Sequence, residues 1–237
     1  MDQRPFFFKK FAMFHHRSTM RVGTDSVLFA RWVEVFSTDK SLDIGTGCGI
    51  IPLIMSQRGV GSVDAVDMDY ESTREADLNF KLSLWKDRLC VFNDDVRNFA
   101  LKNEKKYDLI VSNPPFYSSD VKPIREKKVM ARHVSTLSFK DLLVSVKKML
   151  KDDGRFALVL PYVESRIFIK EAETLGFYLH RDQYVVPIEG KEPNRVNMQF
   201  GLYEVDAVDS NTIVIRNSDY SYSDEYKRFL EDYYLHF

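Results

Sequence analysis

The sequence predicts an α/β fold: a doubly wound, mostly parallel sheet of seven strands, with helices on both faces and an antiparallel strand at one edge. Short apolar runs rich in β-branched residues alternate with helical patterns through most of the chain. The last two strands of this series are joined by a polar, hairpin-like loop, which indicates antiparallel pairing at the edge. The 237 residues fit one domain, 1–237, with an N-terminal cap segment, 1–25, and a C-terminal strand–helix extension, 210–237.

The composition excludes several classes of protein. Hydrophobic residues make up 44% of the chain and charged residues 29%, as in an ordinary soluble globular protein. The formal net charge is −1, so contact with nucleic acid would depend on local basic patches. Cys48 and Cys90 form no disulfide framework, and no apolar run reaches membrane-spanning length. We therefore expect a cytoplasmic protein with no membrane segment and no obligate protein partner.

The N-terminal segment, residues 1–22, is rich in aromatic and basic side chains. It either packs its aromatic rings on the sheet as an edge strand and loop, or contacts RNA, because cations bind phosphate and rings stack on bases. The candidate RNA contacts in this segment are Lys9, Lys10, Arg17 and Arg21. His15 and His16 are adjacent, but no Cys or carboxylate cluster accompanies them, so we expect no metal site.

A glycine-rich turn follows the first predicted strand, residues 41–44. The pattern is Asp43-x-Gly45-x-Gly47-x-Gly49, and a helix is predicted directly after it. Glycines allow the backbone to approach a ligand closely. A carboxylate at position 43 would repel a pyrophosphate, whereas it would suit a zwitterionic ligand that carries an ammonium group. Asp43, Gly45 and Gly47 are therefore candidate cofactor residues.

Two further acids follow the next two predicted strands. Asp67 lies near the end of the strand predicted over 62–69, at the position where nucleotide-binding α/β folds place an acid on the ribose hydroxyls. Asp95 lies in the loop after the strand predicted over 89–92, where a carboxylate can accept a hydrogen bond from an adenine amino group. A solvated turn is the alternative for this loop.

The fourth predicted strand, 107–112, ends in the motif Asn113-Pro114-Pro115-Phe116. Open α/β sheets bind their ligands at the carboxyl ends of such strands. The two prolines carry no backbone N–H, so the side-chain carbonyl of Asn113 and the main-chain carbonyl of Pro114 can face the site as acceptors. A planar amino group has two hydrogens to donate, and Phe116 offers a flat face for stacking. The motif predicts a site for a base-like amine.

The other predicted elements complete the alternation. A basic loop after the motif supplies three more candidate RNA contacts, Lys127, Lys128 and Arg132. Asp69 and Ser138 are predicted N-caps of helices. Helices are predicted at 27–36 with Thr24 or Asp25 as N-cap, 50–58, 71–85, 138 to Gly154, 164–175 and, opened by Ser223, at the end of the chain. In the helix over 71–85, Ala76, Phe80 and Leu84 are expected to be buried. The later strands are predicted at 156–161, 184–188 and 196–205, with 212–216 as a possible short strand.

Taken together, these motifs resemble those of the class I S-adenosylmethionine-dependent methyltransferases, which have a Rossmann-like fold. Over nearly the whole chain the sequence is similar to the bacterial tRNA(valine) adenine-37 N6-methyltransferases. The segments that carry this closer resemblance are Phe8–Phe11, Met20–Asp25, Ala131–His133 before Thr136-Leu137, and Ile213–Arg216 through Tyr226 to Tyr234-Leu235. The motif here ends in Phe116 followed by Tyr117, and either ring is suitable for stacking.

The resemblance implies S-adenosylmethionine as the cofactor and an adenine of tRNA as the substrate. It also implies that Asn113 and Pro114 hold the N6 amine. The alternatives are methylation of a glutamine amide in a release factor, methylation of guanine N2 in ribosomal RNA, an oxidoreductase with a dinucleotide, and a non-catalytic RNA-binding protein. The glycine spacing and Asp43 argue against a dinucleotide, and the complete set of motif residues argues against a non-catalytic protein.

Overall fold

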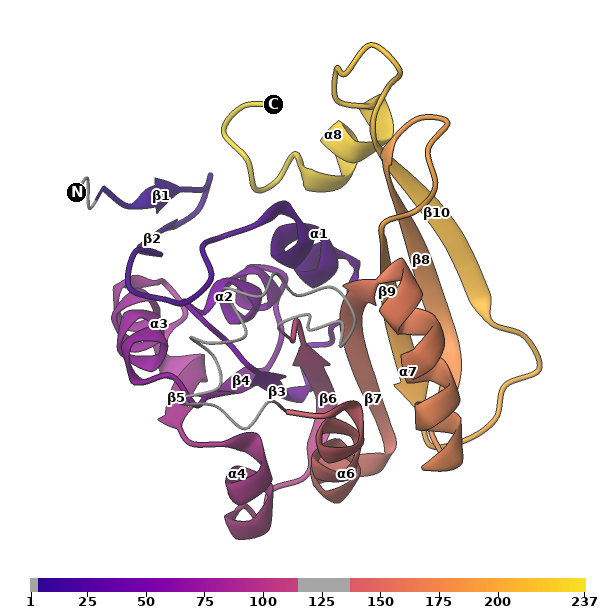
Figure 1. Ribbon diagram of the computed structural model, residues 1–237. Coiled ribbons are helices and arrows are strands. Elements are labelled where there is room, and N and C mark those ends of the chain that lie inside the picture. Colours follow the sequence, from indigo (N-terminus) through magenta and orange to yellow (C-terminus); the bar gives the residue numbers. More distant parts are fainter. Residues whose placement is uncertain (1–3, 115–136) are drawn as a thin grey trace, which may run out of the picture.

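The computed structural model describes residues 4–114 and 137–237. In these residues one eight-stranded sheet forms the centre of the molecule, with the strand order β10-β8-β9-β7-β6-β3-β4-β5 (Figure 1). The strands are β3 (Lys40–Ile44), β4 (Ser62–Asp67), β5 (Leu89–Asn93), β6 (Tyr107–Ser112), β7 (Leu150–Pro161), β8 (Tyr178–Ile188), β9 (Arg195–Gly201) and β10 (Asp209–Arg216). The predicted doubly wound α/β fold is confirmed.

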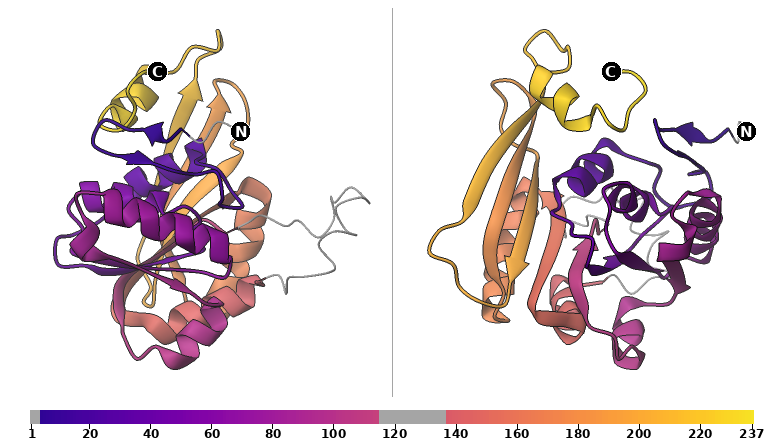
Figure 2. Two further views of the ribbon diagram at one scale, coloured as in Figure 1. Left: turned by 90° about the vertical axis from the view of Figure 1, so that its left-hand side faces the viewer. Right: turned by 180° about the vertical axis from the view of Figure 1, so that it is seen from behind.

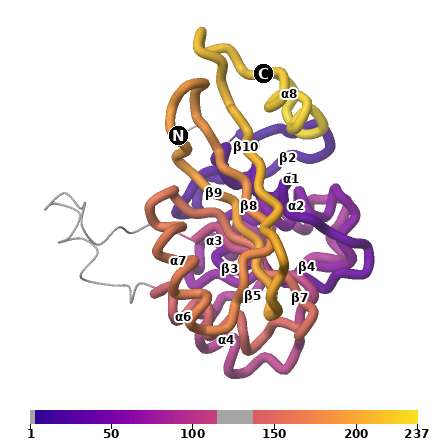
Figure 3. The backbone as a smooth tube through the Cα atoms, turned by 90° about the vertical axis from the view of Figure 1, so that its right-hand side faces the viewer, coloured from indigo at the N-terminus to yellow at the C-terminus, as the bar shows by residue number. Residues whose placement is uncertain are grey.

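The edge of the sheet differs in detail from the prediction. Strands β5, β4, β3, β6 and β7 are parallel neighbours, and β9 is antiparallel to both β7 and β8. The antiparallel strand therefore lies inside the sheet. The short strand expected at 212–216 is the eight-residue β10, which pairs in parallel with β8 and forms the outer edge (Figure 3).

Helices cover both faces of the sheet. They are α1 (Thr24–Trp32), α2 (Ile50–Gln57), α3 (Tyr70–Leu82), α4 (Val96–Lys102), α6 (Phe139–Met149), α7 (Tyr162–Thr174) and α8 (Asp224–Leu230), with a 3₁₀ turn at Lys86–Arg88. One core cluster joins α1, α2, α3 and α8 to one face, and a second joins α4, α6 and α7 to the other. Neighbouring residues of β6, Leu109 and Ile110, enter opposite clusters, as the two-residue period of a strand requires.

The two ends of the chain lie on the same side of the molecule (Figures 1 and 2). The N-terminal segment forms a separate hairpin of β1 (Phe6–Phe7) and β2 (Ala12–Met13). The prediction of an edge strand was wrong, because these two strands pair with each other and not with the central sheet. Its aromatic packing is confirmed: Phe8 and Phe11 are buried, and the ring of Phe8 lies 5.8 Å from that of Tyr234. The Lys9 N–H donates to the Tyr233 carbonyl at 2.8 Å.

The helix ends test the predicted caps. Three are confirmed, because the side chains of Asp69, Ser138 and Ser223 each accept the N–H three residues later. The cap of α1 was wrong: Gly23 is the N-cap and makes no side-chain cap bond. The predicted cap residues, Thr24 and Asp25, are the first two residues of that helix.

Several other boundaries differ from the prediction: α1 ends at Trp32 and not at residue 36, β8 begins at Tyr178 and not at residue 184, and β9 ends at Gly201 and not at residue 205. Leu84 lies beyond the end of α3 and is exposed, whereas Ala76 and Phe80 are buried as expected. Gly154 lies inside β7 and does not end a helix, because the strand pairing already begins at Leu150. None of the helices in residues 4–114 and 137–237 combines the length and the apolar character that crossing a membrane requires.

Candidate active site

The sheet register brings the predicted site residues into one row. Ile44 of β3 is level with Val66 of β4 and with Ser112 of β6. The next residues along these strands are therefore level too, and these are Gly45, Asp67 and Asn113. Because neighbouring strands lie about 4.8 Å apart, Asp67 and Asn113 are separated by about 10 Å of backbone, with the glycine turn between them. All three lie at the carboxyl ends of parallel strands, where this fold binds ligands.

The glycine turn has a conformation that other residues adopt with difficulty. Gly45, Gly47 and Gly49 have φ angles of 74°, 56° and 85°, in the left-handed region that glycine tolerates best. A Cβ at Gly49 would come within 2.5 Å of the Phe80 ring, so this glycine also allows α2 and α3 to pack closely. A Cβ at Gly45 would meet nothing within 4 Å. The Gly45 side of the turn therefore leaves room for a ligand near the backbone.

The Asp67 carboxylate organises the turn. One of its oxygens accepts the Gly47 N–H at 2.8 Å, and the other accepts the Asp69 N–H at 2.9 Å. Burial raises the pKa of Asp67 above its usual value, and these two N–H groups partly offset that rise. A carboxylate has about four lone-pair sites, so Asp67 retains acceptor capacity for hydroxyl groups of a ligand.

The Asp43 carboxylate has a different environment. It is fully buried, and neither of its oxygens has a hydrogen-bond partner of good geometry within the described residues. Burial raises its pKa to about 7; the nearby Thr46 hydroxyl partly offsets the rise, and the Asp67 carboxylate adds to it. A buried carboxylate of this kind is stabilised by a cation. Its surroundings therefore suit a ligand group that carries a positive charge and N–H donors.

Asn113 ends β6 with its two amide atoms in different environments. Its Nδ2 donates to the hydroxyl of Ser26 on α1 at 2.8 Å. Its Oδ1 is buried and has no partner in the part of the chain that the structure describes. The neighbouring Ser112 hydroxyl donates to the Ile44 carbonyl at 2.9 Å and ties β6 to β3. Pro114 is buried, and Phe116 lies outside the described residues.

Asp95 is placed at the same end of the sheet but is engaged by the protein. Its side chain caps α4 by accepting the Arg97 N–H at 2.9 Å, and it also accepts from the guanidinium of Arg97. The Arg97 guanidinium holds the pKa of Asp95 below its usual value. Asp94, the preceding acid in this loop, pairs with Lys102 at 3.2 Å.

A wall of the site that the sequence did not predict comes from the N-terminal segment. Glu75 of α3 is buried, and its carboxylate accepts three successive backbone N–H groups, those of His16, Arg17 and Ser18, at 2.8, 3.0 and 2.9 Å. A Cβ at Gly47 would lie 3.2 Å from the Ser18 hydroxyl oxygen. Ser18 therefore lies directly against the glycine turn.

Asn79, one turn further along α3, holds the same segment. Its amide exchanges two hydrogen bonds with the backbone of Phe14, both at 2.8 Å, and donates at 2.8 Å to the carbonyl of Cys48. Ser72, Glu75 and Asn79 follow a helical spacing and are all buried. A row of polar residues on the buried side of a helix is the signal that could have predicted these contacts.

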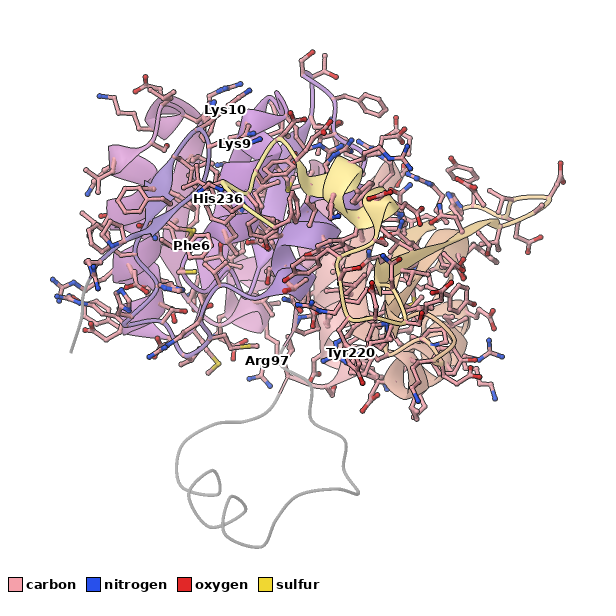
Figure 4. All side chains as sticks on the ribbon, turned by 90° about the horizontal axis from the view of Figure 1, so that it is seen from above. Phe6, Lys9, Lys10, Arg97, Tyr220 and His236 are labelled. Carbon is pink, nitrogen blue, oxygen red and sulfur yellow. The ribbon has the colours of Figure 1, made fainter. Side chains whose placement is uncertain are left out.

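The candidate RNA contacts fall into separate groups. Arg97, at the start of α4, marks the side of the molecule where β5 ends. In Figure 4, Lys9 and Lys10 lie on the opposite side from Arg97. Arg17 belongs to the segment held by Glu75 and Arg21 follows it, and Arg17 lies 3.7 Å from the carboxylate of Glu71. Within the described residues, no group of three or more His, Cys, Asp or Glu side chains could hold a metal ion. The remaining candidates, Lys127, Lys128 and Arg132, lie outside the described residues.

The chain is similar in sequence to known methyltransferases. Residues 12–163 match the model of the methyltransferase small domain. The tRNA1(Val) (adenine(37)-N6)-methyltransferase of Trichodesmium erythraeum is 36% identical over 99% of this chain and 99% of its own length. The enzyme of the same name from Parabacteroides distasonis is 34% identical over 98% of both chains.

A solved structure supports the fold. A predicted O-methyltransferase of Agrobacterium tumefaciens matches 88% of this chain and 96% of its own with a TM-score of 0.63, at only 12% identity. The prediction of a class I S-adenosylmethionine-dependent methyltransferase is thereby confirmed. With full-length relatives at this level of identity, the chain belongs to the family of tRNA1(Val) (adenine(37)-N6)-methyltransferases.

Proposed function

We propose that this protein transfers a methyl group from S-adenosylmethionine to the exocyclic N6 amine of adenine-37 in a valine tRNA, and that it does so in the cytoplasm. One observation supports this proposal above the others: the amide oxygen of Asn113 is buried without a partner in the described residues, at the end of β6. It is level with the glycine turn, two strands from Asp67. An acceptor in that place suits an amine that donates hydrogen bonds.

The proposed cofactor residues are those that surround the glycine turn. Asp43 supplies the buried negative charge for an ammonium group, Gly45 and Gly47 allow a close approach, and Asp67 offers its remaining lone pairs to ribose hydroxyls. Asp95 is proposed to accept a hydrogen bond from the adenine amino group of the cofactor. The backbone N–H and the guanidinium of Arg97 hold its carboxylate in place at the start of α4. S-adenosylmethionine supplies a methyl group on a positively charged sulfur, which makes its carbon electrophilic.

The chemistry at Asn113 follows from the adenine amine. The N6 lone pair is delocalised into the ring, so the planar amine is a weak nucleophile. Acceptors placed on its two hydrogens, the Asn113 side-chain carbonyl and the Pro114 main-chain carbonyl, favour a tetrahedral nitrogen whose lone pair is free to attack. A carbon–nitrogen bond then forms as the carbon–sulfur bond breaks, and the proton lost from the alkylated nitrogen passes to solvent. Positioning supplies most of the rate, and Phe116 is proposed to stack on the base.

We also propose that the chain acts as a single domain. The N-terminal cap segment and the C-terminal extension share one core cluster with α1, α2 and α3, through Phe8, Phe11, Tyr226 and Leu230. The tRNA contacts are proposed among the basic residues Lys9, Lys10, Arg17, Arg21, Lys127, Lys128 and Arg132. The target base leaves its stack to reach the site, which costs less in a loop than in a duplex.

The experiment uses the purified protein, labelled S-adenosylmethionine and total tRNA from a strain that lacks the gene. Digestion to nucleosides should recover the label as N6-methyladenosine, in valine tRNA. Label in release factor would favour the glutamine amide, which is also a planar amine, and label in the guanine of ribosomal RNA would favour the N2 reaction. Either of those results contradicts the proposed substrate.

A further inference from the structure

The hydrogen bond between Asn113 and Ser26 connects positions 87 residues apart in the sequence. Ser26 lies in the first turn of α1, and the next four residues of that helix, Val27–Ala30, are each at most 2% exposed. The N-terminus of α1 is also held from outside, because the Asp25 carboxylate pairs with Arg195 of β9 at 2.9 Å. The Ser26 hydroxyl is therefore presented to Asn113 from a fixed helix.

The orientation of the Asn113 amide matters, since its two ends have opposite hydrogen-bonding character. The torsion that turns an amide is broad and two-fold, so the backbone does not choose between the ends. With Nδ2 on Ser26, Oδ1 is left as the free acceptor. A serine hydroxyl can donate as well as accept, so the bond to Ser26 fixes the plane of the amide, and a substrate amine then disfavours the turned amide because donors would meet donors.

We infer that Ser26 is a positioning residue, which fixes the plane of the Asn113 amide at the substrate amine, so that the amine meets the Asn113 oxygen as its acceptor. This inference rests on the proposed function, and Ser26 does not itself contact the reacting atoms. It gives two of the residues at the start of α1 a role other than the helix capping predicted there: Asp25 anchors the helix, and Ser26 uses that anchored position to hold the Asn113 amide.

A matched pair of variants tests the role. Ser26→Thr keeps a hydroxyl, whereas Ser26→Val has the same shape and the same β-branched cost in a helix but carries a methyl group instead. With saturating tRNA and cofactor, the single-turnover rate of methylation should be about threefold to tenfold lower for Ser26→Val than for Ser26→Thr. This ratio is the rate equivalent of one neutral hydrogen bond. Affinity for S-adenosylhomocysteine and the melting temperature should agree between the two variants.

A double-mutant cycle separates positioning from a general effect on α1. The Thr-to-Val ratio is measured again in the Asn113→Ala background, where there is no amide to orient, and it should fall to about one. Equal rates for Thr and Val with Asn113 present would overturn the inference. So would an undiminished ratio in the Asn113→Ala background, because the effect would then act through the helix.

A second readout does not depend on the reaction. The side-chain amide signal of Asn113 in a nitrogen-15 spectrum is assigned by its loss in Asn113→Ala. Its hydrogens should exchange with water more slowly in Ser26→Thr than in Ser26→Val, and equal exchange would contradict the positioning role. Failure of the proposed function has a different signature: the wild-type protein would place no label on adenine N6, or Asn113→Ala would be as active as the wild type.

Discussion

At the scale of single residues, the same side chain has different roles in different surroundings. Asp67 and Asp43 lie at the ends of neighbouring strands. Asp67 accepts two backbone N–H groups and stabilises the turn, whereas Asp43 is buried without such partners in the described residues. Replacing Asp67 would therefore disturb the turn as well as any ribose contact, while replacing Asp43 would mainly remove a charge.

The raised pKa of Asp43 predicts a pH dependence of cofactor affinity. Without cofactor the group ionises at about pH 7, and an ammonium group next to it favours the ionised form. Binding therefore requires loss of a proton below that pH, so affinity should fall as the pH falls through 7. For a single group with this pKa, the decrease from pH 8 to pH 6 is about tenfold.

Calorimetric titration with S-adenosylhomocysteine at pH 6, 7 and 8 measures this effect. Repeating it in two buffers of different ionisation enthalpy counts the protons released. Asp43→Asn is the control, because it keeps the shape and removes the ionisation: its affinity should be weak and flat across the same range. A wild-type affinity that does not change between pH 6 and pH 8 would show that Asp43 is not the cation-binding group.

At the scale of elements, α3 connects the N-terminal segment to the glycine turn. Ser72, Glu75 and Asn79 project from the buried side of this helix, and Glu75 and Asn79 hold the backbone of Phe14 and of His16–Ser18. A buried carboxylate usually needs a cation, but Glu75 is stabilised by three N–H groups that converge on it. Helix α3 thus lies beside the glycine turn and also holds the N-terminal segment that packs against the same turn.

Glu75→Ala should destabilise the protein and weaken cofactor binding together. Three N–H groups lose their acceptor, and among them the Ser18 N–H is buried, so a loss of at least about 1–3 kcal/mol, the cost of one buried unsatisfied group, is expected. Urea unfolding gives the stability, and calorimetry gives the affinity for S-adenosylhomocysteine. Glu71→Ala is the matched control, since Glu71 is on the same helix but more exposed and paired only at 3.7–3.8 Å. Equal stability of the two variants would contradict the role of Glu75.

The strand and turn positions could be predicted from the sequence because they follow from local physics. The alternation of strands and helices, the glycine turn and the Asn113 motif each depend on a few neighbouring residues, and Asp69, Ser138 and Ser223 cap as their types predict. The partners of Ser26 and Glu75 could not be predicted, because they lie 87 and 57 to 59 residues away and depend on the folded sheet.

At the scale of the whole molecule, both chain ends contribute to the same core, and the strand ends define one functional side. Arg97 follows β5 at that side, whereas Lys9 and Lys10 lie opposite to it in Figure 4. The net charge of −1 gives no general attraction to RNA. Affinity for tRNA should therefore come from a local group of cations near the site and not from the surface as a whole.

This arrangement predicts unequal effects for the two pairs of basic residues in the N-terminal segment. Changing Arg17 and Arg21 to Ala should weaken binding to all tRNAs alike, and the slope of log affinity against log salt should fall by about 0.7 to 0.9 for each phosphate that is no longer neutralised. Changing Lys9 and Lys10 to Ala should have a smaller effect. Filter binding or fluorescence anisotropy over a salt series measures both, and a larger effect for the lysine pair would place the RNA on the opposite side.

The rate of methylation by Asn113→Ala tests the role of the Asn113 amide most directly. With saturating tRNA and cofactor, the single-turnover rate should fall by about a hundredfold to a thousandfold, the usual cost of removing one preorganised electrostatic partner. Affinity for S-adenosylhomocysteine should survive, since Asp43 and Asp67 remain, and Asn113→Asp should be more active than Asn113→Ala because it keeps an acceptor oxygen. If Asn113→Ala methylates adenine at close to the wild-type rate, Asn113 is only the end of a strand and the acceptor mechanism is wrong.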